Sequence, residues 1–230
     1  IEAGENTREA LREACRSAGM TDAEAESIFN AWGGTIRALC DAGLIGYAVR
    51  EQKTFIRLPH FEPMEANEAR LEMARRYFAH FGPATVRDAA YFFGATQSQV
   101  KTWLDRLPVR AVPCGGRTYY ALEGGASEPD AAHGIPPCLL LAGFDQLMLG
   151  YQKRESLFFR PEHLRGIFNL AGIVAPTVLM NGRVVGKWKR SGRRLTVTPF
   201  EAVHAADRRR IEEEALRLFP ALADIAFTER

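Results

Sequence analysis

The sequence predicts an α+β fold, in which two similar helical units precede a β-rich C-terminal domain. In the first unit, apolar residues recur at helical spacing along successive segments, and two short strand-like runs follow them. The same order then appears a second time. After a turn-rich linker the pattern changes to short apolar runs around Asn181-Gly182, a strong hairpin signal.

The first unit spans residues 1–63. Asn6 or Thr7 can cap its first helix. Thr21 caps a second helical stretch with Glu24 three residues on, which is a capping box. We expect Gly33-Gly34 to break this stretch ahead of a third helix. The two predicted strands of this unit are 44–45 and 55–58.

The second unit spans residues 64–126 and repeats this order. Thr85 and Thr96 cap two of its helices, and Gln99 stands at the capping-box position after Thr96. Three helices followed by a β-hairpin is the layout of a winged helix, so the sequence predicts two winged helices in tandem. The third helix of such a unit commonly meets DNA, although winged helices also bind proteins. The predicted strands of this unit are 109–113 and 117–122.

The C-terminal domain spans residues 127–230 and begins within a turn-rich linker at 124–137. Its strands alternate with turns, and an amphipathic helix ends before Pro220. The predicted strands are 138–141, 177–180, 183–189 and 195–200, and the predicted helix is 206–218.

Basic residues gather in this domain although the net charge of the chain is only +2. Between Asn181 and Phe200 there are six bases and no acids. Ordinary surfaces mix both signs, so this stretch predicts contact with a polyanion such as duplex DNA, with plain solvation as the alternative. With strict alternation, Arg183, Lys187 and Lys189 would share one face, and Val184, Trp188 and Arg190 the other. The predicted DNA-binding residues are Arg183, Lys187, Lys189, Arg190, Arg193 and Arg194.

Composition argues against several other classes of protein. No apolar run is long enough to span a membrane, and the first residues do not form a signal peptide. The four cysteines have no close pairing, which argues against a zinc site and favours a reducing cytoplasm. We expect no metal and no cofactor, a cytoplasmic protein without membrane contact, and a monomer.

Four separate stretches resemble the AlkZ/YcaQ-like winged-helix DNA glycosylases, in the order that the family has them. Together they cover roughly residues 65–200, whereas residues 1–63 fit the family by layout only. The stretches are Gly82-Pro83-Ala84-Thr85-Val86-Arg87-Asp88; Gly143-Phe144-Asp145-Gln146 with Leu149-Gly150-Tyr151 and Arg154; Gly172 with Ala175-Pro176; and Asn181-Gly182-Arg183-Val184-Val185-Gly186-Lys187-Trp188.

The resemblance implies a DNA-binding portion of a glycosylase that excises alkylated or crosslinked bases. The family has three tandem winged helices and carries its catalytic Gln-apolar-Gln or Gln-apolar-Asp motif in the first. Nothing here matches that unit, so we expect no catalytic residue in this segment and a catalytic winged helix upstream in the native gene. Gln97-Ser98-Gln99 has a polar middle residue, and we interpret it as capping.

Asp145 and Arg154 are a possible cleft pair, which could form an internal salt bridge or face DNA. Two other functions stay open at this point: a tandem winged-helix transcriptional regulator, and a DNA-binding or scaffold protein without catalysis.

Overall fold

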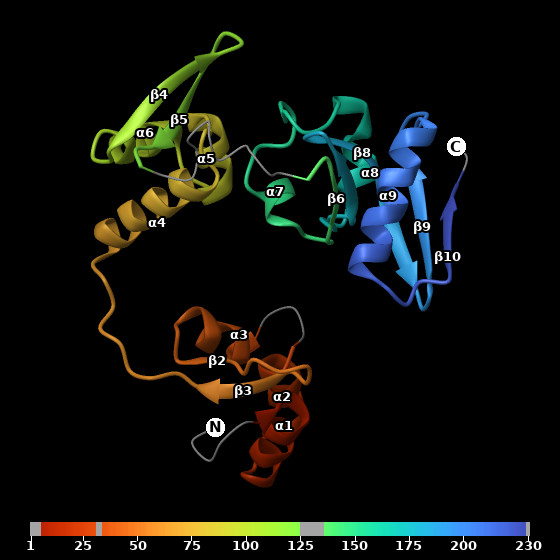
Figure 1. Cartoon of the computed structure of the whole chain (residues 1–230). Helices are drawn as coiled ribbons and strands as arrows, with labels where there is room; N and C mark the ends of the chain where they lie inside the picture. Colours follow the sequence, from red (N-terminus) through yellow and green to blue (C-terminus); the bar gives the residue numbers. More distant parts are fainter. Residues whose placement is uncertain (1–5, 31–33, 125–135, 229–230) are drawn as a thin grey trace. The chain divides into compact units, whose positions relative to one another are not determined.

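The computed structural model describes residues 6–30, 34–124 and 136–228. The chain divides into two compact units, Ile1–Met64 and Glu65–Arg230 (Figure 1). The second helical repeat and the C-terminal sheet thus belong to one compact unit. A boundary between residues 126 and 127 stays a prediction, because most of the linker lies outside the described residues.

The first unit has three helices followed by a hairpin, in the predicted order. Thr7 caps the first helix by accepting a hydrogen bond from the amide of Ala10, and the Thr21–Glu24 capping box is present. A strand that the sequence did not indicate precedes the first helix and completes a sheet of order β1-β3-β2. The elements are β1 (Asn6–Thr7), α1 (Arg8–Ser17), α2 (Asp22–Ile28), α3 (Gly34–Asp41), β2 (Ile45–Tyr47) and β3 (Thr54–Arg57).

Helices α4, α5 and α6 and the β4–β5 hairpin repeat this order at the start of the second unit. Thr85 and Thr96 cap α5 and α6 through complete capping boxes, and Gly94 ends α5 in the left-handed conformation. Tyr77, Phe78 and Val100 are buried between these elements. The elements are α4 (Ala66–His80), α5 (Val86–Phe93), α6 (Gln97–Leu104), β4 (Val109–Cys114) and β5 (Arg117–Leu122).

A five-stranded sheet of order β10-β9-β8-β7-β6 organises the C-terminal part. Neighbouring strands are antiparallel except β10, which pairs in parallel with β9. Short helical turns connect β6 to β7. The elements are β6 (Cys138–Leu141), α7 (Gln146–Leu149), η2 (Pro161–His163), α8 (Leu164–Ile167), β7 (Thr177–Met180), β8 (Arg183–Ser191), β9 (Arg194–Pro199), α9 (Ala205–Leu218) and β10 (Asp224–Phe227).

The two faces of this sheet pack against different partners. On one face α9 covers the sheet, where its Ile211 packs with Val178 and Leu195 (Figure 1). On the other face Leu179 and Val184 pack with residues of α7, α8 and the connections between them. The α+β fold class predicted from the sequence is confirmed. None of the helices in the described parts of the chain is long and apolar enough to cross a membrane.

Candidate nucleic-acid interface

A β-bulge in β8 determines where the basic residues of the hairpin point. Val184 pairs with Leu179 and Gly186 pairs with Val178, so Val185 is one extra residue on β8. A bulge residue breaks the strict alternation of side chains along a strand. Arg183 is therefore opposite Met180 on the α9 face, whereas Lys187 and Lys189 lie on the other face.

The prediction that Arg183, Lys187 and Lys189 share one face was wrong for this reason. Val184 likewise lies on the opposite face from Trp188 and Arg190. Trp188 packs on the α9 face against Phe219 and is only half-buried. Its indole N–H donates to the carbonyl of Leu141 at 2.9 Å.

Lys187 and Lys189 lie on one face of β8 and differ from Arg190, Arg193 and Arg194 in their surroundings. Both are exposed, and no described residue forms an ion pair or hydrogen bond with either ammonium group. On the same face and across the strand pair lie Thr196, Thr198 and Arg194. We call this set the open sheet face; its members are the exposed Lys187, Lys189 and Arg194 and the half-buried Thr196 and Thr198.

Three of the remaining predicted cations, Arg190, Arg193 and Arg194, have partners within the chain, whereas Arg183 has none among the described residues and lies on the opposite face from the lysines. The guanidinium of Arg190 lies 4.8 Å above the ring of Phe219. Arg193 donates to the carbonyl of Ala221 at 2.9 Å, and Arg194 pairs with Asp224 at 3.0 Å. These residues are exposed but partly neutralised or held by the fold, so Lys187 and Lys189 are the strongest candidates for contact with an external anion.

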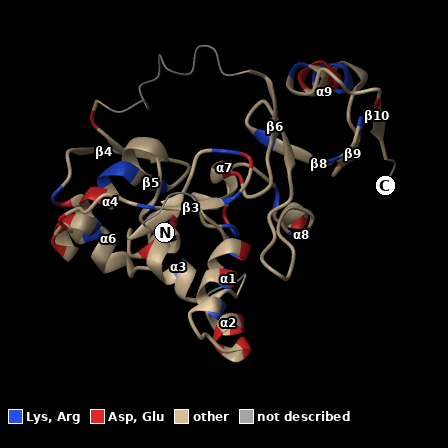
Figure 2. Cartoon of the chain, turned by 90° about the horizontal axis from the view of Figure 1, so that it is seen from below, with Lys and Arg blue, Asp and Glu red and all other residues tan. Residues whose placement is uncertain are grey.

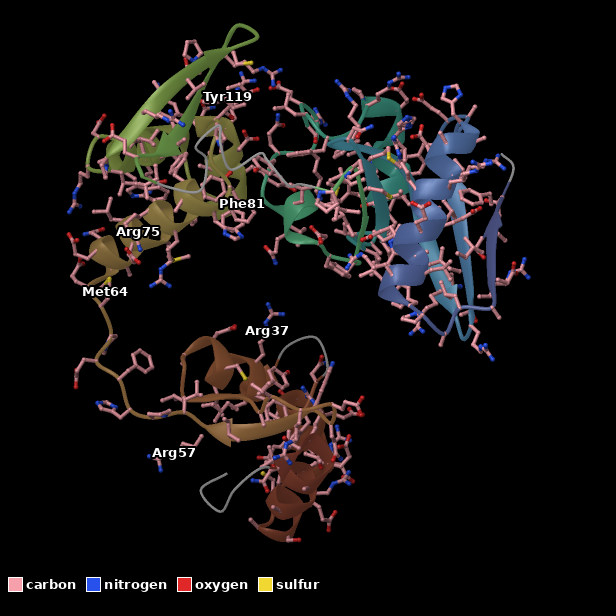
Figure 3. The ribbon with its side chains drawn as sticks, viewed as in Figure 1. Arg37, Arg57, Met64, Arg75, Phe81 and Tyr119 are labelled. Atoms are coloured by element: carbon pink, nitrogen blue, oxygen red, sulfur yellow. The ribbon has the colours of Figure 1, made fainter. Side chains whose placement is uncertain are left out.

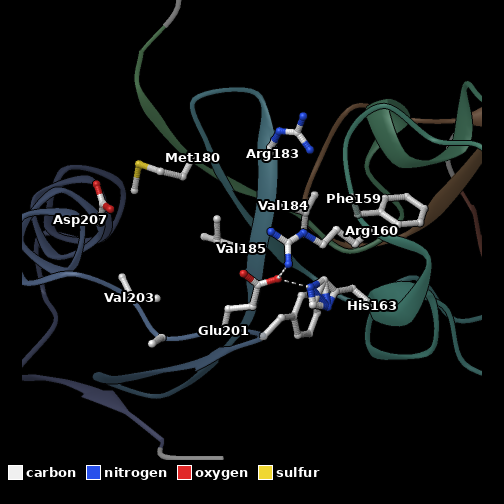
Figure 4. Close-up of a pocket in the computed structure, with 12 residues that line it drawn as sticks. Phe159, Arg160, His163, Met180, Arg183, Val184, Val185, Glu201, Val203 and Asp207 are labelled. Atoms are coloured by element: carbon white, nitrogen blue, oxygen red, sulfur yellow. Dashed lines mark hydrogen bonds and ion pairs between the residues drawn. The ribbon is translucent and has the colours of Figure 1, made fainter.

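Arg183 lies at the rim of a cavity of about 140 Å³ on the C-terminal domain (Figure 4). Inside it, one carboxylate oxygen of Glu201 is 2.7 Å from Arg160 and 3.0 Å from the imidazole of His163. Glu162 lies close enough to complete a set of possible metal ligands. The guanidinium of Arg160 already occupies that carboxylate, and its charge would repel a cation, so this arrangement is an ion-pair cluster.

Asp145 and Arg154 do not pair with each other. Asp145 instead caps α7, where its side chain accepts a hydrogen bond from the amide of Leu147 at 2.9 Å. Arg154 is exposed and has no hydrogen bond or ion pair among the described residues. Of the two alternatives for this pair, the internal salt bridge is therefore not formed, because local capping satisfies the carboxylate of Asp145.

The first two family-like stretches are joined through Asp88. The buried carboxylate of Asp88 accepts hydrogen bonds from the amide of Thr85 at 2.9 Å and from the amide of Gln152 at 3.1 Å. Tyr77 donates its hydroxyl proton to the carbonyl of Gly150 at 2.8 Å. These contacts join the second helical repeat to the C-terminal domain, a role that no local sequence pattern indicates.

Two tyrosines at this junction are buried, and burial raises the pKa of both hydroxyl groups. Tyr151 donates to the carbonyl of Phe81, which follows α4 (Figure 3), at 2.7 Å. Burial, with a contribution from the carboxylate of Asp88, raises the pKa of Tyr151 to about 12. Burial raises the pKa of Tyr77 further. Both hydroxyls therefore remain protonated donors over the physiological range.

Glu155 forms a second part of the junction, which the sequence did not indicate. Its carboxylate lies 2.9 Å from Arg87 and 3.3 Å from Arg117, so it links α5 to the β4–β5 hairpin. Gln99 accepts a hydrogen bond from the amide of Thr96 at 2.9 Å as part of a capping box. The interpretation of Gln97-Ser98-Gln99 as capping thus agrees with the structure at Gln99.

Charge elsewhere on the C-terminal domain is mixed. Along α9, basic and acidic side chains interleave (Figure 2). Arg210 pairs with Asp207 and Arg217 pairs with Glu214 within this helix. Unlike this helix, the open sheet face belongs to a stretch of chain, residues 163–200, that contains no acidic residue.

Comparison with known proteins places these features in a family. The family model described as "DNA glycosylase AlkZ-like" matches residues 2–220. An interstrand DNA cross-link repair glycosylase of Streptomyces sahachiroi is 27% identical over 203 residues, which are 83% of this chain and 55% of that protein. The chain therefore spans about half the length of this curated relative.

The solved structure of Streptomyces sahachiroi DNA glycosylase AlkZ has the same fold, with a TM-score of 0.76 and 24% identity. The match covers 99% of this chain and 66% of that one. The family model, which covers nearly the whole chain, establishes the relationship. The chain belongs to the AlkZ-like DNA glycosylase family.

Proposed function

We propose that this chain is the DNA-binding portion of a glycosylase that removes alkylated or crosslinked bases from duplex DNA. The two units of three helices and a hairpin act as winged helices in this proposal, and the open sheet face holds the phosphate backbone. The observation that carries the proposal is the pair Lys187 and Lys189, exposed and without an anionic partner among the described residues.

Phosphate binding suits this face on physical grounds. A cation already paired with a carboxylate must give up that pair to bind DNA, whereas an unpaired lysine loses only water and counterions. Thr196 and Thr198 lie beside the lysines and offer hydroxyl donors to phosphate oxygens. Such contacts hold a duplex without reading its sequence, as a glycosylase that meets lesions in any sequence requires.

We further propose that this chain holds DNA without cleaving the glycosidic bond. Gln99, which resembles one residue of a catalytic glutamine pair, is engaged in the capping box of α6. The catalytic winged helix would then come from residues outside this sequence. Duplex binding without release of an alkylated base is the expected behaviour of the 230-residue chain.

The experiment is a salt titration of affinity for a random-sequence duplex, measured by fluorescence anisotropy. The double variant Lys187→Ala/Lys189→Ala should reduce the slope of log K against log salt by about 1.8, because each phosphate contact contributes about 0.9. The matched control is Arg208→Ala/Arg209→Ala, which removes the same charge from α9 on the opposite side of the sheet.

The control should leave the slope nearly unchanged. Equal slopes for the wild type and the lysine variant would refute phosphate binding at the open sheet face. An equal reduction of the slope in both double variants would show that the net charge of the chain determines the slope and the position of the charge does not.

A further inference from the structure

Two neighbouring loops on the C-terminal domain expose apolar side chains to solvent. The first, Gly143–Asp145, presents Phe144, which is 50% exposed. The second, Asn169–Ile173, presents Leu170 at 89% exposure and Ile173 at 44%. We call these two segments the apolar loop pair. Exposed apolar side chains that gather at one place commonly mark a binding surface.

Backbone hydrogen bonds hold the two loops next to each other. The amide of Phe144 donates to the carbonyl of Val174 at 3.3 Å, directly beyond the second loop. Within that loop, the side chain of Asn169 accepts a hydrogen bond from the amide of Ile173 at 2.8 Å. The exposed side chains are thus presented on defined turns.

Phe144 has a backbone conformation that is costly for an aromatic residue. Its φ is 57°, in the left-handed region that bulky side chains rarely adopt. The conformation persists because Asp145 caps α7 on one side and Val174 accepts the Phe144 amide on the other. A strained residue usually serves packing or function. Since half of the Phe144 side chain faces solvent, burial in the core does not account for the strain.

The charges around the apolar loop pair indicate which kind of partner can bind there. The second loop lies within residues 163–200, a stretch without any acidic residue. The ammonium of Lys153 lies 4.4 Å above the ring of Phe168, which pairs with Val174 at the base of both loops. A partner with an anionic exterior and an apolar interior fits this arrangement. Duplex DNA is such a partner, because its phosphates surround the stacked bases.

We propose that the apolar loop pair enters the base stack of duplex DNA, with Phe144 as the inserted ring. This inference rests on the proposed function and assigns a role to a residue that phosphate binding does not use. Apolar side chains between base steps unstack them, which exposes a nucleotide for later chemistry. Phe144 is a positioning residue here, because it would act on the base stack and not on the glycosidic bond that reacts.

The test uses a duplex that carries 2-aminopurine, whose fluorescence rises when it is unstacked. The wild-type chain at saturating concentration should raise the signal several-fold. Phe144→Gly should abolish the rise and weaken binding roughly tenfold, the effect of losing one stacked aromatic contact. Glycine adopts a positive φ without strain, so the melting temperature of Phe144→Gly should stay equal or increase.

The matched control is Leu216→Ser, which removes an exposed leucine from α9 (47% exposed) and should leave the signal intact. If Phe144→Gly binds the duplex and leaves the 2-aminopurine fluorescence unchanged, the insertion of Phe144 is overturned while the proposed function stands. Absence of any duplex binding by the wild type would overturn the proposed function and the insertion with it. Stronger cosedimentation with anionic lipid vesicles than with DNA, lost in Phe144→Gly, would assign the loops to a membrane surface instead and also overturn the insertion.

Discussion

Asp88 offers a direct test of how the second helical repeat is fixed to the C-terminal domain. Its carboxylate is 7% exposed and accepts three hydrogen bonds: from the amide and the hydroxyl of Thr85, at 2.9 and 2.7 Å, and from the amide of Gln152, at 3.1 Å. Asp88→Ala leaves both amides without this acceptor in a place that water reaches poorly. Counting only the two amide bonds, at about 1.5–3 kcal/mol for each hydrogen bond to a charged group, the expected loss of unfolding free energy is about 4 kcal/mol, since the Thr85 hydroxyl can turn to another partner.

The matched control is Gln99→Ala in the capping box of the next helix. Gln99 has the same position relative to Thr96 that Asp88 has to Thr85, but it is exposed and makes no contact across the junction. Its loss should cost about 0.5–1 kcal/mol. With an m value of about 2 kcal/mol/M, the urea midpoints should fall by about 2 M for Asp88→Ala and by less than about 0.5 M for Gln99→Ala. Equal shifts would refute the argument that burial and the bond to Gln152 set the cost.

Two further predictions concern aromatic residues of the same unit. Trp188→Ala should lower the unfolding free energy by about 2 kcal/mol, which is less than for a fully buried tryptophan because the ring of Trp188 is half-buried. Urea unfolding measures this loss, and a loss near zero would contradict the packing of Trp188 on Phe219. Folding raises the pKa of Tyr151 from 10.0 to about 12, so the unfolded chain loses the hydroxyl proton at lower pH than the folded chain does. The contribution of Tyr151 to the unfolding free energy is therefore fully present below about pH 10 and is lost as pH rises toward 12. Tyr151→Phe should flatten this alkaline decline, and an unchanged decline would show that other groups cause it.

Local patterns account for the parts of the fold that the sequence predicted well. The Thr21, Thr85 and Thr96 boxes depend on residues three apart, so the sequence contains the whole interaction. The turn at Asn181-Gly182 is equally local, and both residues have the positive φ that such a turn requires.

Contacts between distant segments account for what the sequence did not predict. The strand β10 pairs with β9 across the whole of α9, and β1 pairs with β3 across three helices. Asp88 could be recognised from sequence as a capping residue, but its bond to Gln152 joins segments 64 residues apart. Composition located the basic residues of the hairpin, yet their division between two faces depended on one unpaired residue.

That residue is Val185: three residues separate Arg183 from Lys187, which in a regular strand would place both on one face, but the bulge takes up one of the three and places them on opposite faces. Deletion of Val185 would remove the bulge and keep Val184 opposite Leu179 and Gly186 opposite Val178, so Arg183 and the lysines would stay on their present faces. Deletion of a paired residue such as Gly186 would instead exchange the two faces along one part of the strand. When relatives of this chain are aligned, a one-residue gap at Val185 therefore leaves the predicted surface unchanged, whereas the same gap at a paired position of β8 changes it more than most substitutions do.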